Sequence, residues 1–149
     1  MPRILGVSCS PTVAFLALLV DGAIQIEPDR MPWPVGEASE RLAVAQDEIA
    51  DLLNELGVDK VAVLLPERDP RFKWPYETAA TRASMETLFR LAAVRGKIPV
   101  EVLDRGTVRS RLKLTGKLDL HLDRVAPAGK AWRQGRGEAA LAAAAAELA

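Results

Sequence analysis

The segment Lys60–Leu65, with the sequence KVAVLL, most constrains the fold of this chain. It is a continuous apolar run without polar alternation, which is typical of a strand buried on both faces. Helical patterns flank it at residues 37–56 and 76–95, and they end at Gly57 and Gly96, as helices often do. A strand buried on both faces needs a layer of structure on each side, so the pattern predicts an α/β protein.

The first part of the chain predicts an antiparallel meander of three strands, at Arg3–Val7, Thr12–Val20 and Ala23–Glu27. Asp21-Gly22 is a tight-hairpin signal between the second and third strands. A further strand is expected at Val100–Leu103, and two more helices are expected at residues 107–112 and 138–148. Together these elements predict a five-stranded mixed sheet with helices on both faces.

Length and composition fit one globular domain over residues 1–149. The chain has a mass of 16.1 kDa, with 49% apolar and 27% charged residues. No apolar run reaches the roughly 18 residues that a membrane span needs. No signal-type segment follows Met1, so a cytoplasmic protein is expected. Cys9 is the single cysteine, which excludes an internal disulfide.

A net charge of zero hides a basic segment between Arg105 and Arg136, in which only Asp119 and Asp123 are acidic. Such a segment on an otherwise acidic chain predicts a surface for phosphate backbones or for an acidic partner. Trp132 lies within it and is the best candidate for a stacking contact. The cations of the segment are Arg105, Arg109, Arg111, Lys113, Lys117, Arg124, Lys130, Arg133 and Arg136. All of these except Arg124, together with Trp132, are the predicted nucleic-acid-binding residues.

Asp119, His121 and Asp123 alternate with three leucines. On a strand they would form one Asp-His-Asp face, which could ligate a metal or do acid–base work. On a helix, Asp119 and Asp123 would share a solvated face. The sequence leaves both readings open. It contains neither a phosphate-binding glycine loop nor a nucleophile elbow.

Several short segments, in this order and spacing, are similar to one known group of proteins. They are Ile4–Val7, Glu40–Leu42, Val58–Val63, Gly96–Val100, Thr107–Arg109, Leu114–Lys117 and Glu138–Ala142. Over nearly the whole chain they resemble the RNase H-like superfamily, and within it the RuvC-type Holliday-junction resolvases. The resemblance implies an RNase H-like fold, a role with nucleic acid (DNA before RNA) and a homodimer.

The resemblance also implies where catalytic residues would lie. Those nucleases hold two Mg²⁺ ions with about four carboxylates, at the ends of the first and fourth strands and on the last helix. Here the strand positions correspond to Ser8 and Leu64, and the helix retains only Glu138, followed by alanines. Glu67 lies three residues beyond the fourth-strand position.

The sequence therefore predicts a non-catalytic RuvC-like module that needs no cofactor. Its basic segment would bind nucleic acid or a protein that handles nucleic acid. One alternative is an active Mg²⁺-dependent endonuclease that uses Glu67 and Glu138. A second is a protein-assembly module without a nucleic-acid role, in which the basic segment meets an acidic partner.

Overall fold

The computed structural model describes residues 2–34, 38–66, 76–127 and 129–148. The strands are β1 (Arg3–Cys9), β2 (Val13–Val20), β3 (Ala23–Ile24), β4 (Arg30–Pro32), β5 (Lys60–Leu64) and β6 (Val100–Leu103). The α-helices are α1 (Ala38–Leu56), α2 (Tyr76–Arg95), α3 (Arg105–Leu112) and α4 (Arg136–Glu147). Two 3₁₀ helices, η1 (Leu118–Arg124) and η2 (Trp132–Gln134), connect α3 to α4.

The strands form one mixed sheet in the order β3-β2-β1-β5-β6, and β4 also pairs with β2. β1 is antiparallel to β2 and parallel to β5, and β5 is parallel to β6. The mixed α/β sheet expected from the sequence is therefore confirmed. In this register Ser8 pairs with Phe15 on one side and with Leu64 on the other, which sets the neighbours of the candidate site.

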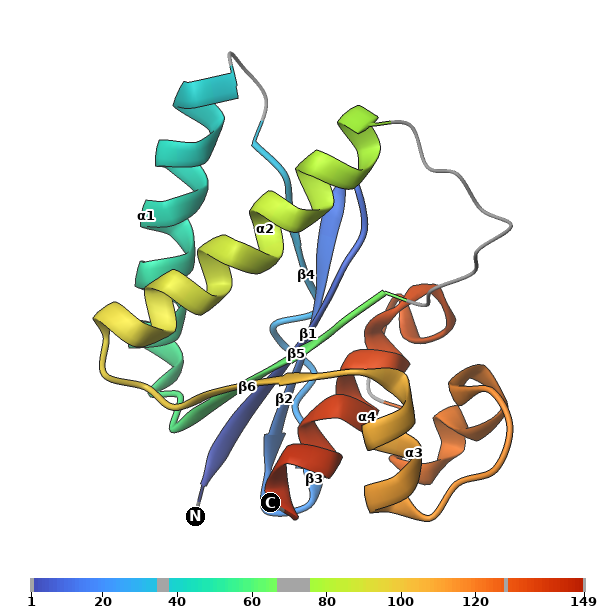
Figure 1. Cartoon of the computed structure of the whole chain (residues 1–149). Helices are drawn as coiled ribbons and strands as arrows, with labels where there is room; N and C mark the ends of the chain where they lie inside the picture. The colour runs from blue at the N-terminus through green and yellow to red at the C-terminus, as the bar shows by residue number, and fades with distance from the viewer. Residues whose placement is uncertain (1, 35–37, 67–75, 128, 149) are drawn as a thin grey trace.

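Helices cover both faces of the sheet, as Figure 1 shows. Side chains that alternate along β1 go to opposite sides: Leu5 and Val7 pack with residues of α1 and α2, whereas Ile4 packs with residues of α3, η1 and α4. The sheet therefore separates two hydrophobic cores, and α4 lies directly against the second of them.

The contact between α4 and β1 is very close because both sides of it are small. A Cβ atom added to Gly6 would lie 1.9 Å from the carbonyl oxygen of Ala139 and 3.2 Å from the Cβ of Ala143. The alanines of α4 leave room for its backbone to approach the sheet, and nine residues of this helix are buried. Only glycine fits at position 6 with the helix in this place.

The expected third strand, Ala23–Glu27, was wrong in extent. Strand β3 ends at Ile24, and β4, which the sequence reading missed, resumes pairing with β2 at Arg30. Between them Gln25 and Asp29 still bond to the backbone of β2, and the carbonyl oxygens of Gln25, Ile26 and Pro28 accept hydrogen bonds from the guanidinium of Arg136. A side chain more than 100 positions away thus binds the segment between the two short strands, and the sheet has six strands.

Among the residues that the structure describes, no helix is both long and apolar enough to cross a bilayer.

We expect the substitution Gly6→Ala to lower the free energy of unfolding by about 3 kcal/mol, the upper end of the range for overpacking, because the new methyl group meets backbone atoms of α4. Urea denaturation measures this change. Gly106→Ala on α3 is the matched control, since its nearest neighbouring atom would be 3.4 Å away and alanine favours a helix. Equal stability of Gly6→Ala and the wild type would contradict the close packing of α4.

Candidate functional site at the carboxyl edge of the sheet

The parallel strands β1, β5 and β6 end at the same edge of the sheet, and this edge holds the positions that the sequence singled out. Ser8 near the end of β1 pairs with Leu64 at the end of β5. Both side chains lie on the α4 side, because Leu64 packs in that core and Ser8 shares a face with Ile4. Ser8 is 5% exposed.

The first turn of α4 lies over the same edge. Ala139 is packed on Gly6, and a Cβ atom on Gly135 would meet the ring of Phe15, the strand partner of Ser8. Glu138 lies between these two contacts in the chain, and its carboxylate forms an ion pair with Arg105 at 2.8 Å. Arg105 is the first residue of α3, which follows β6. Strand ends and helix starts that are far apart in sequence therefore meet here.

A second ion pair lies on the α2 side of the edge. Arg82 and Glu86 are one helical turn apart on α2, 3.3 Å from each other, and nearly buried. Burial raises the pKa of Glu86 and lowers the pKa of Arg82, and each partner partly offsets the effect on the other. The positive charge of Arg105 lowers the pKa of Arg82 further, which places the two ion pairs within electrostatic reach.

The sequence reading missed Arg82 and Glu86 as parts of this edge. A usable signal was present: they share their face of α2 with Met85 and Phe89, which are fully buried. A charged pair at core-facing positions has to find its partners inside the protein.

The residues at the edge do not fit a two-metal centre. Mg²⁺ takes hard, preferably anionic oxygen ligands. Ser8 offers a neutral hydroxyl, Leu64 offers no ligand, and the carboxylate of Glu138 is bound to a guanidinium. Within residues 2–34, 38–66, 76–127 and 129–148, no group of three or more His, Cys, Asp and Glu side chains could hold a metal ion. Glu67, the other predicted catalytic residue, lies outside the described residues.

The basic segment divides into three structural groups. Arg105 and Arg111 form ion pairs, with Glu138 and Glu101 respectively. Trp132 and Arg136 are buried. The remaining cations are exposed or half-buried and form no ion pair within the described residues: Arg109, Lys113, Lys117, Arg124, Lys130 and Arg133. We call these six residues the basic surface.

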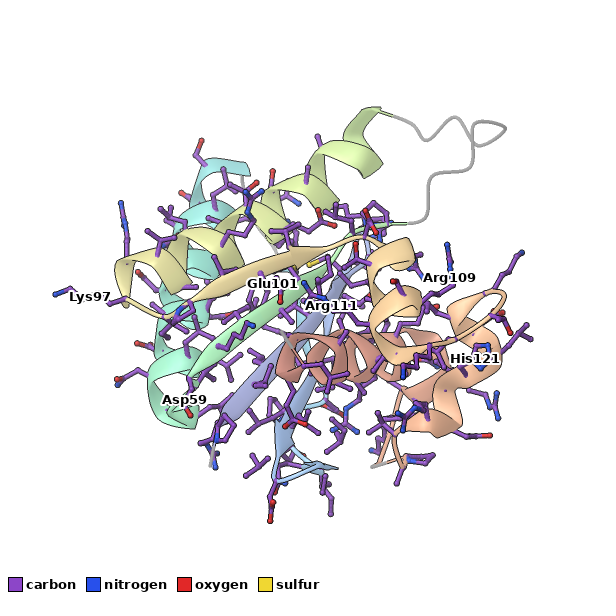
Figure 2. The ribbon with its side chains drawn as sticks, turned by 60° about the horizontal axis from the view of Figure 1, so that its bottom comes forward. Asp59, Lys97, Glu101, Arg109, Arg111 and His121 are labelled. Atoms are coloured by element: carbon purple, nitrogen blue, oxygen red, sulfur yellow. The ribbon has the colours of Figure 1, made fainter. Side chains whose placement is uncertain are left out.

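Figure 2 shows the contrast on α3. Arg111 points to Glu101, whose pKa is lowered by hydrogen bonds from Arg111 and then from Lys60. Arg109, two positions earlier, lies on the other side of the helix and points away from Glu101. The two arginines therefore have different roles: Arg111 joins the outer strand β6 to α4, and Arg109 faces outward.

The prediction that Arg136 and Trp132 contact nucleic acid is wrong for this structure, because both are buried. The guanidinium of Arg136 donates to the carbonyl oxygens of Leu16, Gln25, Ile26 and Pro28 at 2.7–3.2 Å. The indole Nε1 of Trp132 donates to the carbonyl oxygen of Leu122 at 3.2 Å. Arg133 and Gln134, which lie between them, are exposed, so a reading by local composition could not separate these residues.

Asp119, His121 and Asp123 lie on neither a strand nor an α-helix. They lie on η1, which is kinked at His121. Leu118 and Leu122 are buried, and the His121 ring nitrogen Nε2 contacts the carbonyl oxygen of Thr115. The Asp-His-Asp pattern therefore reflects a short amphipathic segment that packs on the α4 side of the sheet.

Known proteins resemble this chain in structure and not in sequence. No protein family matches the sequence, and no curated protein is similar to it at a significant level. RuvC of T. thermophilus in complex with a Holliday junction substrate superposes with a TM-score of 0.73 and 15% identity, over 99% of this chain and 94% of that one. A second structure, Thermus thermophilus RuvC, gives 0.72 and 16%, over 98% and 93%. These similarities confirm the RNase H-like fold of RuvC type and, at such identity, concern the fold alone.

We expect Arg136→Gln to lower the free energy of unfolding by about 3 kcal/mol, because a buried charge-assisted donor is lost and several backbone carbonyls lose their partner. Thermal or urea denaturation measures the change. Arg133→Gln, three positions earlier and exposed, should stay within about 0.5 kcal/mol of the wild type. If the two variants were equally stable, the structural role assigned to Arg136 would be refuted.

Burial is the main cause that raises the pKa of the Cys9 thiol above its ordinary value, followed by the charge of Glu86. The unfolded chain therefore loses this proton at lower pH than the folded protein. Its contribution to stability should be complete below about pH 8.5 and should decline as the pH rises above that value. Urea denaturation at pH 7.5 and 9.5 tests this for the wild type and Cys9→Ala. Identical pH dependence in both proteins would contradict the prediction.

Proposed function

We propose that this chain is a RuvC-like module that binds nucleic acid through its basic surface and does not cleave it. One observation carries the proposal. The edge that corresponds to the nuclease centre holds Ser8, Leu64 and a Glu138–Arg105 ion pair, while six cations nearby in sequence are left without ion-pair partners in the described part of the chain. The similarity to a RuvC protein solved with a Holliday junction substrate supports nucleic acid as the ligand.

The basic surface has the chemistry of a phosphate-binding surface. Arg109 lies on α3, and Lys113 follows directly after this helix as its C-cap residue, in a left-handed backbone conformation. The other members follow in η1, η2 and the loops beside them. Cations without internal partners are free to replace the counterions of a nucleic-acid backbone, and this replacement favours binding. Such binding depends on salt and little on base sequence.

The absence of cleavage follows from the charges at the edge. Hydrolysis of a phosphodiester by this fold would need carboxylates to hold metal ions that activate water. The carboxylate of Glu138 is already neutralised by Arg105, and the two strand positions carry no charge. We therefore assign no reaction step to Ser8, Leu64 or Glu138. DNA is the first candidate ligand, in a cytoplasmic protein that needs no cofactor, and a homodimer is the proposed assembly.

The test is fluorescence anisotropy with a four-way DNA junction, duplex DNA and single-stranded RNA, each with and without Mg²⁺, at 50 and 200 mM salt. If all six cations contact phosphates, affinity should fall about a thousandfold between the two salt concentrations. Arg109→Gln, Lys113→Gln and Arg133→Gln should each reduce the slope of log affinity against log salt by about one. No cleavage should accompany binding.

Arg95→Gln combined with Lys97→Gln is the matched control, because these exposed cations lie at the end of α2, and Figure 2 shows Lys97 far from Arg109. This control should bind like the wild type. Metal-dependent cleavage that Glu138→Gln abolishes would replace the proposal by the nuclease alternative. Failure to bind any of the three probes at low salt would leave the assembly alternative, with an acidic protein as the partner.

A further inference from the structure

The guanidinium of Arg105 has donors that the protein itself does not satisfy. Its Nη2 pairs with Glu138 at 2.8 Å, but its Nε is buried and has no hydrogen-bond partner. A planar guanidinium offers donors in a fork that suits two acceptor oxygens of a phosphate. A buried donor without an acceptor is uncommon in folded proteins and calls for an explanation such as an absent ion.

Ser8 offers a second donor group at the same edge. This residue is 5% exposed and faces the side on which α4 begins. The helix α4 also starts at this edge, and its N-cap residue, Gly135, makes no side-chain hydrogen bond, whereas the carboxylate of Asp104 already caps the start of α3. Starts of helices carry partial positive charge and favour anions. The surroundings of Arg105 therefore suit an anionic ligand.

The carboxylates of the described residues at this edge are each held by partners within the chain. Asp104, the N-cap of α3, accepts a hydrogen bond from the backbone N–H of Thr107 at 2.7 Å, and this bond, followed by the charge of Arg109, lowers its pKa. Ser8 and Leu64 are uncharged, and the two glutamates, Glu86 and Glu138, are balanced by Arg82 and Arg105. The only anion in contact with Arg105 within the described residues is the carboxylate of Glu138, and both side chains remain partly exposed, at 16% and 22%. A phosphate could therefore reach the guanidinium and compete with Glu138 for it.

The position of Arg105 links this edge to the basic surface. Arg105 and Arg109 are four residues apart on α3, with a rise of about 6 Å between them. A nucleic-acid backbone that contacts Arg109 along the helix would therefore reach Arg105 next.

We infer that Arg105 binds a backbone phosphate of the nucleic acid without a metal ion, and that Glu138 occupies Arg105 until this phosphate displaces it. The inference rests on the proposed function and extends it to the edge of the sheet. In this role Glu138 competes with the phosphate for Arg105, whereas in a nuclease a carboxylate at this position would bind Mg²⁺.

The sign of the Glu138→Gln effect tests the inference. Without Mg²⁺, this variant should bind the four-way junction roughly fivefold more tightly, the factor that corresponds to one partly exposed ion pair. Arg105→Gln should weaken binding and reduce the salt slope by about 0.9. In the double variant the gain from Glu138→Gln should disappear, because its effect acts through Arg105.

Asp119→Asn is the matched control, since it removes one negative charge from an exposed position beside the basic surface. A gain equal to that of Glu138→Gln, or a gain that persists in the double variant, would show a general charge effect and overturn the inference. Circular dichroism and thermal denaturation identify variants that are unfolded. For any such variant, Arg105→Ala and Glu138→Ala replace the original substitutions and are judged by the same outcomes.

A titration with inorganic phosphate tests the Arg105 site independently of nucleic-acid binding. Titration of the full chain, followed by the NMR shift of the Arg105 Nε–H group, should show saturable binding that is tighter in Glu138→Gln. An unchanged Arg105 signal would overturn the inference even if the chain binds DNA. A phosphate-dependent shift in a protein that binds no nucleic acid would retain the site and reject only the proposed function.

Discussion

The close approach of α4 to β1 is the constraint on which the rest of the structure depends. The backbone of the helix lies against Gly6, and its alanines fill the space between helix and sheet without holding the two apart. This contact fixes the start of α4, and thereby places Glu138 at the carboxyl edge and the guanidinium of Arg136 inside the protein. A bulkier residue at either surface would move both side chains at once.

Arginine side chains join parts of the fold that hydrophobic contacts alone would leave loosely specified. The guanidinium of Arg136 donates hydrogen bonds to the carbonyl oxygens of the segment between β3 and β4 and so holds this segment in place. Arg111, together with Lys60, connects Glu101 on the edge strand β6 to the last carbonyl oxygens of α4. These cations satisfy backbone acceptors at a helix end and at a break in the sheet, where regular pairing stops.

The layout of the candidate site follows from the fold, whereas its chemistry follows from the side chains. The strand ends, the helix starts and the register of β1 with β5 bring Ser8, Leu64 and Glu138 to one edge. Similarity of fold specifies that these backbone positions meet at one edge, but it does not specify which side chains they carry. An ion pair between Arg105 and Glu138 gives the edge a neutral balance of charge within the chain itself.

The sequence by itself determined most of the element order, the strand buried on both faces and the helices on both sides, because periodicity and residue identity are local properties. Tertiary structure alone decided which cations of the basic segment are exposed. Arg133 and Arg136 are surrounded by similar residues in the sequence. In the packed structure Arg133 is exposed, whereas Arg136 donates to carbonyl oxygens of β2 and of the segment between β3 and β4. The same contacts between distant segments paired Glu138 with Arg105 and interrupted the third strand.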